Sequence, residues 1–325
     1  MANLPNGLAD AHSKLLQITQ AVSSVVIGQE DLVQLILIAG VSRGHALVEG
    51  LPGLAKTLTI STFASCISGD FARIQFTPDL LPADLTGTMV FDPRDSEFHV
   101  RKGPLFANVI LADEINRAPA KVHSALLEAM EENTVSIGGH TLSLPKPFVV
   151  LATQNPIEQE ATYRLPEAQL DRFMFKIKVD YPTEEDELTV LNRQLSGGSA
   201  DVSPVVSVKE LVGLQDVIGQ VRIDDRIRRY ILRLVQATRP SEVSAVDALT
   251  GLVEYGASPR ASSFLASGAQ AAALIDGRDY VIPEDVKELA KPVLRHRIIL
   301  TYRAQADEVY TDDIIDELLQ RISVP

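Results

Sequence analysis

Cysteine is almost missing from this sequence, in which Cys66 is the single example among 325 residues. One thiol cannot close an intrachain disulfide, and the lack of a Cys-x-x-Cys pair excludes the common thiolate metal and redox sites. The six histidines are scattered, with none paired at i, i+4, so a zinc site is not expected either. Cys66 itself is predicted to be a small buried hydrophobe near the end of a helix.

Long apolar runs are also missing. The longest, Leu35–Val41, is far shorter than the roughly 20 residues that cross a bilayer, so no membrane span is expected. The N-terminal segment MANLPNGLADAHSK has no basic region followed by an apolar core, which argues against a secretory signal. These absences predict a cytoplasmic protein.

Basic residues are in deficit, because 30 Lys and Arg face 43 Asp and Glu and the formal net charge is −13. Binding of nucleic acid or anionic lipid across the whole surface is therefore not expected, although a local basic channel stays open. A basic patch is suggested by Arg222, Arg226, Arg228, Arg229 and Arg233. Because Asp224 and Asp225 interleave with these arginines, a solvated and partly paired helix face is the better prediction.

The length of 325 residues predicts two domains, and 46% hydrophobic with 22% charged residues is the balance of a globular protein. Residues 1–182 alternate short apolar runs with helical patterns such as Lys56–Ser65 and Ala120–Glu132. This alternation predicts a parallel sheet with helices on both faces. The runs with the length of buried strands are His45–Glu49, Arg73–Phe76, Val109–Ala112, Phe148–Ala152 and Phe173–Val179.

Two segments interrupt this alternation. Residues 86–101 predict a hairpin that turns at Asp92–Asp95, and residues 133–144 predict another that turns at Gly138 and Gly139.

The character of the sequence changes after residue 182. Thr183 can cap the helix that follows, and Gly197–Ser199 is typical of a flexible link. Beyond that link the pattern is helical throughout, with a capping box formed by Ser207 and Glu210. The sequence therefore predicts an α/β domain over residues 1–182 and a smaller helical domain over residues 183–325.

A phosphate site is predicted by His45–Thr57, which reads HALVEGLPGLAKT. Unpaired backbone N–H groups at a strand–turn–helix junction, at the positive end of the helix dipole, bind phosphate oxygens. Lys56 is expected to reach the β- and γ-phosphates of ATP, and the Thr57 hydroxyl to ligate Mg²⁺. The residues predicted to contact the nucleotide here are Gly50, Leu51, Pro52, Gly53, Leu54, Ala55, Lys56, Thr57 and Leu58.

Ala55 departs from the usual G-x-x-x-x-G-K-[ST] pattern, in which a glycine precedes the lysine. Gly50 and Gly53 keep the tight part of the turn, and alanine fits if its φ is negative, which we therefore expect. On this segment alone, a plain strand–turn–helix corner stays an alternative.

Two acids follow the apolar strand at Val109–Ala112, namely Asp113 and Glu114. Ligands bind at the carboxyl ends of strands in an open parallel sheet, so both acids are expected beside the phosphates. Asp113 would hold Mg²⁺ through its water shell, and Glu114 would polarise the hydrolytic water. The alternative for such a pair after a strand is a helix N-cap.

A polar amide follows another predicted strand, because Phe148–Ala152 leads into Asn155. Its side chain is suited to orienting water against the γ-phosphate. The alternative is a turn residue before Pro156.

The stretches GLPGLAKT, LADEINRAPAKVHSALLEAMEE, LATQNP and LPEAQLDRF, in this order, resemble the MoxR family of AAA+ ATPases. The resemblance covers nearly the whole chain, including the C-terminal GASPRASSFL, and an alanine at the place of Ala55 is usual in the family. It implies an α/β P-loop core with strand order 5-1-4-3-2 and a C-terminal helical lid.

The resemblance also implies roles for single residues. Asn155 is similar to the sensor-1 residue. Arg172 resembles the arginine finger that is offered to the γ-phosphate of a neighbouring subunit. Arg260 resembles the sensor-2 arginine, although it too could act in trans. Arg117 and Arg164 stay open as alternatives to Arg172.

Two further placements follow from the residues and the resemblance. Ser258 and Pro259 are expected to start a helix, which would put Arg260 in its first turn. The adenine is expected near Val26–Gln29, in contact with Ile27 and Gly28.

Together the residues and the resemblance predict Mg²⁺-dependent hydrolysis of ATP to ADP and phosphate. The family implies a ring, a hexamer, that remodels or activates a client protein in a chaperone-like way, the client often carrying a von Willebrand A domain. The alternatives are a nucleic-acid-stimulated AAA+ motor and a nucleotide-dependent assembly switch with little hydrolysis. Glu114 separates the switch from the ATPase, because a switch needs no general base.

Overall fold

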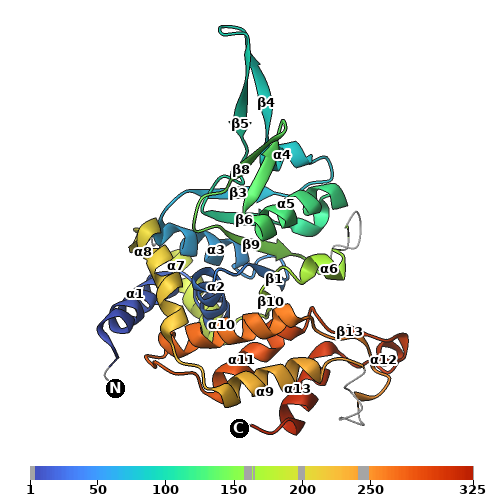
Figure 1. Cartoon of the computed structure of the whole chain (residues 1–325). Helices are drawn as coiled ribbons and strands as arrows, with labels where there is room; N and C mark the ends of the chain where they lie inside the picture. The colour runs from blue at the N-terminus through green and yellow to red at the C-terminus, as the bar shows by residue number, and fades with distance from the viewer. Residues whose placement is uncertain (1–3, 157–162, 164, 197–201, 241–248, 325) are drawn as a thin grey trace.

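The computed structural model describes residues 4–156, 163, 165–196, 202–240 and 249–324. Five parallel strands form the central sheet, in the order β10-β1-β9-β6-β3 (Figure 1). Their bounds are β1 Ala46–Gly50, β3 Phe71–Gln75, β6 Val109–Asp113, β9 Val149–Gln154 and β10 Phe175–Val179. Numbered among themselves along the chain, these strands stand in the order 5-1-4-3-2, so the predicted sheet is confirmed.

The three central strands of the sheet, β1, β9 and β6, are buried on both faces, because successive residues of each strand enter different apolar cores. In β6, Val109 and Leu111 belong to one core, whereas Ile110 and Ala112 belong to the other. Strands buried on both sides read as continuous apolar runs, which is why they were visible in the sequence. The helices that cover the two faces are α1 Asn6–Ser23, α2 Glu30–Val41 and α3 Lys56–Ser65 on one side and α5 Ala120–Glu132 on the other.

The helices α3 and α5 have the predicted bounds. Cys66 follows α3 as its C-cap residue and is 0% exposed, so the prediction of a small buried residue at a helix end is confirmed. Burial raises the pKa of its thiol to about 11, which keeps it protonated and unreactive at neutral pH.

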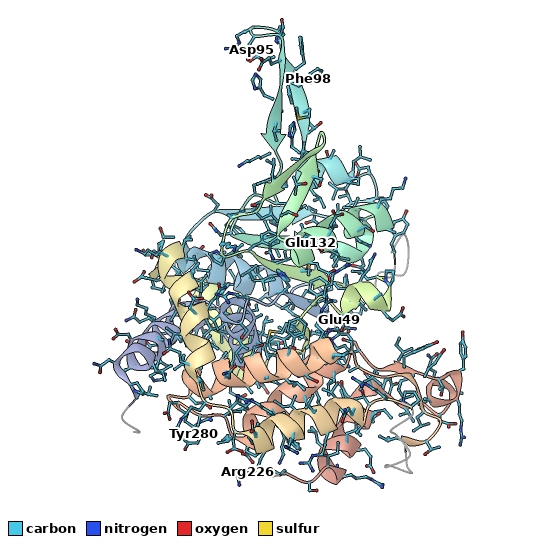
Figure 2. All side chains as sticks on the ribbon, in the orientation of Figure 1. Glu49, Asp95, Phe98, Glu132, Arg226 and Tyr280 are labelled. Atoms are coloured by element: carbon cyan, nitrogen blue, oxygen red, sulfur yellow. The ribbon has the colours of Figure 1, made fainter. Side chains whose placement is uncertain are left out.

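Both predicted hairpins are present, as β4 Gly87–Asp92 with β5 Glu97–Lys102 and as β7 Thr134–Ile137 with β8 His140–Ser143. The short α4 Pro82–Thr86 leads into the first hairpin, which projects far beyond the sheet (Figure 1). Asp95 and Phe98 lie at its outer end (Figure 2). Gly138 and Gly139 have φ values of 57° and 82°, the left-handed backbone that their turn requires.

The C-terminal part is mostly helical; α8 lies beside α3 in Figure 1, whereas α9, α10, α11 and α13 lie below the sheet. Thr183 caps α7 by accepting from the Asp186 amide, and Ser207 and Glu210 form the predicted capping box of α8. Pro259 lies at the start of α10, after the N-cap Ser258. The helices of this part are α7 Glu184–Leu195, α8 Val208–Val217, α9 Asp225–Gln236, α10 Pro259–Ile275, α11 Pro283–Leu294, α12 Tyr302–Ala306 and α13 Thr311–Arg321, with the 3-10 turn η2 Ile218–Gln220. The 3-10 turn η1 Ile115–Arg117 and the short α6 Glu167–Leu170 lie between strands of the central sheet.

The prediction of a wholly helical C-terminal part is wrong in detail. β11 Val206–Ser207 pairs in parallel with β2 Ile67–Ser68 of the core, and β12 Val253–Tyr255 pairs with β13 Ile299–Leu300. Strands of two or three residues are too short to show the period of two by which strands are recognised. The predicted boundary at residue 182 stays a prediction, and the link at Gly197–Ser199 lies outside the described residues.

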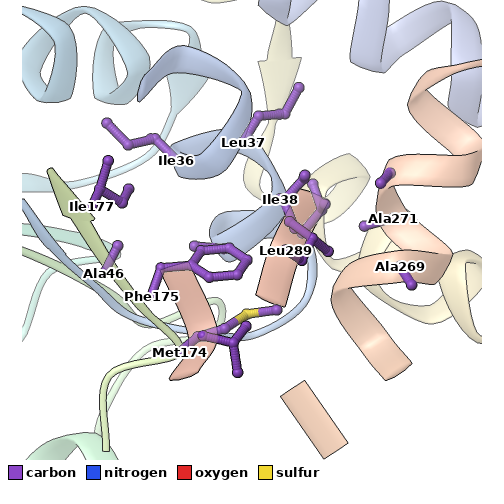
Figure 3. Packing of buried hydrophobic residues seen from close by; sticks show 14 of the residues in the cluster. Ile36, Leu37, Ile38, Ala46, Met174, Phe175, Ile177, Ala269, Ala271 and Leu289 are labelled. Atoms are coloured by element: carbon purple, nitrogen blue, oxygen red, sulfur yellow. The ribbon is translucent and has the colours of Figure 1, made fainter. Parts of the chain in front are cut away.

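One apolar core joins the sheet to the C-terminal helices. Figure 3 shows α2 side chains such as Ile38 facing β10 and the helices α10 and α11. Gly268 of α10 lies so close to the sheet that a Cβ there would stand 3.0 Å from the Met174 Cε and 2.9 Å from the Leu289 Cδ1. Within the described ranges, no helix has the length and apolar character needed to cross a membrane.

Candidate nucleotide site

The predicted phosphate loop connects the end of β1 to the start of α3. The Lys56 ammonium donates to the carbonyl oxygens of Gly50 and, at 2.8 Å, Leu51. Burial lowers the pKa of Lys56, while the carboxylates of Asp113 and Glu114 oppose that shift. Lys56 is thus a half-buried cation that is hydrogen-bonded to the carbonyls of its own loop and lies near the acids Asp113 and Glu114.

Ala55 corrects one prediction, because its φ is 56° and not negative. It is the N-cap residue of α3, and the turn requires left-handed backbone immediately before Lys56. This requirement explains the usual glycine at this place, since a left-handed residue with a Cβ costs about 1–2 kcal/mol. The alanine therefore adopts the glycine conformation at some cost in stability.

The carboxyl ends of neighbouring parallel strands bring the predicted residues together. Asp113 is the last residue of β6, Glu114 comes directly after it, and Asn155 follows β9, which is paired with β6. A cleft of about 390 Å³ unites these ends with the phosphate loop. Its lining comprises Pro52, Gly53, Leu54, Ala55, Lys56, Thr57, Leu58, Arg73, Gln75, Asp113, Glu114, Thr153, Gln154 and Asn155.

Asp113 is held from two sides. The Thr153 hydroxyl donates to its Oδ1 at 2.6 Å, and the Arg73 guanidinium donates to its Oδ2 at 2.6 and 3.2 Å. The residue Asp113 is only 6% exposed, and it lines the cleft that Thr57 also lines. A hydroxyl and a carboxylate are the hard oxygen donors that Mg²⁺ prefers, so the residues present fit this ion.

Glu114 has left-handed backbone, with φ 54° and ψ 51°, at the start of the 3-10 turn η1. Its Oε2 accepts from the Gln75 amide at 2.8 Å and from the Arg117 guanidinium at 2.9 Å. Its side chain makes no capping bond to that turn, so the alternative of a helix N-cap is not supported. The carboxylate is instead fixed at the cleft.

Comparisons with known proteins find matches for both the α/β core and the C-terminal helical part. Residues 45–175 match the model of the ATPase family associated with various cellular activities (AAA), and residues 250–318 match that of the AAA lid domain. Chaperone MoxR1 of Mycobacterium tuberculosis is 46% identical over 98% of this chain and 84% of its own length. The chain belongs to the MoxR family of AAA+ ATPases.

Two further proteins show how far the MoxR likeness extends. Protein MoxR of Paracoccus denitrificans is 32% identical, and 99% of each chain is covered. A crystal structure of a protein from Cytophaga hutchinsonii, assigned as an ATPase, superposes with a TM-score of 0.91 at 46% identity, covering 98% of this chain and 97% of the other. The MoxR fold, with its AAA+ core and lid, therefore spans nearly the whole chain.

In this MoxR-family chain, Arg172 and Arg260 lie together but outside the lining of the cleft among the described residues. Arg172 donates to the Glu131 Oε2 through Nε at 2.6 Å and Nη2 at 2.5 Å, and Arg260 donates to Oε1 at 2.8 Å. The two arginines lower the pKa of Glu131. The Glu131 carboxylate, near the end of α5, thus binds both arginines.

The two rivals of Arg172 differ from it. Arg117 binds Glu114, an acid that lines the cleft of its own chain. Arg164 lies outside the described residues. Arg172 and Arg260, in contrast, share Glu131 as their partner.

The predicted adenine segment lies against the start of α7. Gly28 has a φ of 69°, and a Cβ there would lie 2.8 Å from the Asp186 side chain. Gln29 donates to the carbonyl of Asp180 at 3.3 Å, and Asp180 lines a hollow of about 210 Å³ beside Gly50 and Leu51. Ile27 and Gly28 are not among the residues that line the phosphate cleft.

Sequence reasoning missed the polar residues that hold the two acids. Arg73 and Gln75 alternate along β3, and Gln75 is in register with Asp113. Polar side chains at alternate positions in an otherwise apolar strand were the available signal, since they mark one face at the strand end. Thr153 and Gln154, just before Asn155, gave a similar signal.

Proposed function

We propose that this chain hydrolyses ATP to ADP and phosphate with Mg²⁺ as the cofactor. The observation that carries the proposal is one cleft in which Lys56 and Thr57 of the phosphate loop face Asp113 and Glu114. The family supports nucleotide binding, and the cleft supplies what hydrolysis needs in addition. An acid held beside the phosphates can accept a proton from water.

Each residue of the cleft has a proposed task. When ATP binds, the Lys56 ammonium leaves the carbonyls of Gly50 and Leu51 and donates to the β- and γ-phosphates. A charged phosphate accepts a stronger hydrogen bond from an ammonium than a neutral carbonyl does. Thr57 and Asp113 would hold Mg²⁺, which neutralises charge on the phosphates when bound. Glu114, fixed by its two partners, polarises the attacking water, and Asn155 orients that water.

Lys56→Ala tests the phosphate site. We expect ATP affinity to fall about 10–100-fold, because a charge-assisted hydrogen bond contributes about 1.5–3 kcal/mol. Titration calorimetry in the presence of Mg²⁺ measures the affinity for ATP. The rate of phosphate release, measured with Mg²⁺ and again with EDTA, shows whether turnover depends on Mg²⁺. The exposed Lys209 of α8 offers a control, since Lys209→Ala should leave both unchanged. Unaltered affinity in Lys56→Ala would remove the phosphate loop from the proposal.

We also propose that Arg172 and Arg260 act on the nucleotide of a neighbouring copy in a ring, a hexamer by family resemblance. Their place away from their own cleft supports this, because a head-to-tail interface joins two different surfaces of the same chain. Glu131 occupies both arginines until another anion replaces it. An exposed ion pair of this kind is weak, so the exchange is energetically accessible.

The proposed client is a protein. The relative named Chaperone MoxR1 supports a chaperone-like role, and the family resemblance suggests a client with a von Willebrand A domain. The hydrolysis cycle would remodel or activate that client.

A nucleic-acid motor is the second candidate, and single- and double-stranded DNA should leave the rate of phosphate release unchanged. The helix α9 carries arginines that already have acidic partners, such as Arg226 with Asp224 and Arg228 with Asp225. With a net charge of −13, little free positive potential is left for phosphate backbones. Strong stimulation by either DNA would favour the motor instead.

A further inference from the structure

A buried guanidinium lies directly beneath the turn that carries Arg172. The Arg297 side chain is 1% exposed, and its Nε donates to the Asp171 Oδ1 at 2.7 Å. Its Nη2 donates to the carbonyls of Asp171 at 2.8 Å and Phe173 at 2.6 Å, and its Nη1 donates to the carbonyl of Met174 at 3.2 Å. The side chain of Arg297, a residue of the lid, therefore donates hydrogen bonds to backbone carbonyls on both sides of Arg172.

Asp171 also holds the helix that carries the second arginine. The Ser258 hydroxyl, which caps α10, donates to the Asp171 Oδ2 at 2.9 Å and to Oδ1 at 3.1 Å. Arg260, in the first turn of α10, lies 3.8 Å from Oδ2. The carboxylate of Asp171 thus connects the Arg172 turn, the start of α10 and Arg297.

Burying the charged guanidinium of Arg297 costs free energy of desolvation. Burial lowers the pKa of Arg297 to about 10, while the attraction of Asp171 opposes the shift, so the group stays charged at neutral pH. An apolar residue of similar size could fill this space at less cost in desolvation. A planar guanidinium, however, fixes several acceptors in one geometry, which an apolar side chain does not.

We propose that Arg297 and Asp171 are positioning residues, which lock the Arg172 turn and the start of α10 to the lid so that Arg172 and Arg260 act as one two-arginine unit. The inference rests on the proposed function, in which these arginines serve the nucleotide of a neighbouring copy. Any movement of the lid then moves both arginines together. A change of lid position in one copy is thereby delivered to the active site of the next.

Arg297→Gln removes the grip, and Arg295→Gln is the matched control. Arg295 lies on the same lid segment, is 11% exposed in its side chain, and donates to the carbonyl of Lys176 and to Asp312. It therefore also bridges lid and core, but not at the Arg172 turn. We expect Arg297→Gln to lose about 10²-fold in kcat with little change in KM, the effect of a displacement of about 1 Å, and Arg295→Gln to keep its rate.

Mixing with Glu114→Gln subunits distinguishes positioning from a general loss of structure. The Glu114→Gln subunit lacks the proposed base but has an intact two-arginine unit. The Arg297→Gln subunit keeps the base but has a displaced two-arginine unit. At equal amounts we expect the mixture to regain about one quarter of the wild-type rate, because half of the sites keep the base and half of those face an intact unit. A damaged fold in Arg297→Gln would not be repaired by a neighbour.

The outcomes separate the two proposals. If Arg172→Ala regains activity with Glu114→Gln but Arg297→Gln does not, or if Arg297→Gln alone is fully active, the positioning role is wrong. If neither mixture regains activity, the action on a neighbouring nucleotide itself is wrong. Should Arg297→Gln fail to fold by circular dichroism, Asp171→Asn, which keeps the size of the side chain, takes its place in the same measurements.

Discussion

Arg172→Ala is expected to bind ATP as the wild type does and to hydrolyse it about 10³–10⁵-fold more slowly, the range known for arginine fingers. Binding should survive because Arg172 does not line the described cleft and contacts Glu131 instead. Turnover should fail because the γ-phosphate of the neighbouring copy loses its stabilising cation. Calorimetry and steady-state phosphate release measure the two effects separately.

The control for this loss is an exposed arginine of an acidic ion pair that has no proposed role. Arg228→Ala removes a guanidinium that pairs with Asp225 on α9, and it should leave both quantities unchanged. Retained turnover in Arg172→Ala would move the role to Arg260, Arg117 or Arg164. Weakened ATP binding would instead place Arg172 at the nucleotide of its own chain.

Glu114→Gln is expected to keep ATP affinity and to lose about 10²–10⁴-fold in rate, the usual contribution of a general base. The amide keeps the shape of the side chain but cannot take a proton from water. Single-turnover hydrolysis with Mg²⁺ isolates the chemical step, and Glu97→Gln on the projecting hairpin serves as the control. Equal hydrolysis by Glu114→Gln would favour the assembly switch or another base.

The same variant offers a way to the client. A chain that binds ATP without hydrolysing it stays in the ATP-bound state, in which we expect the proposed client to stay bound. Affinity capture of Glu114→Gln with ATP, compared with capture by Lys56→Ala, therefore selects proteins whose retention depends on nucleotide.

The sheet could be predicted because its information is local. The central strands β1, β6 and β9 are short, mostly apolar runs, and β6 and β9 end in the polar residues Asp113 and Gln154. The helix α3 begins at Lys56 and ends before Cys66. The phosphate loop and the acids at Asp113 and Glu114 follow from the same local patterns, since strand ends in a parallel sheet meet at one edge.

What could not be predicted depends on distant pairing or on the conformation of single residues. The contact of Arg73 with Asp113 depends on the register of two strands that are far apart in the sequence. The grip of Arg297 on Asp171 joins still more distant segments. The sign of φ at Ala55 was inferred from the alanine side chain, but the turn decides it.

The projecting hairpin of β4 and β5 differs mechanically from the body that bears it. Phe91 and Phe98 form a cross-strand pair with ring centroids 5.3 Å apart, yet they are 49% and 64% exposed. A lone two-stranded ribbon is marginally stable in water, so the outer half of this hairpin opens far more readily than the sheet. The rigid α/β body thus carries a flexible hairpin. A partner that binds the outer half of this hairpin must offset the conformational entropy that the hairpin loses on binding.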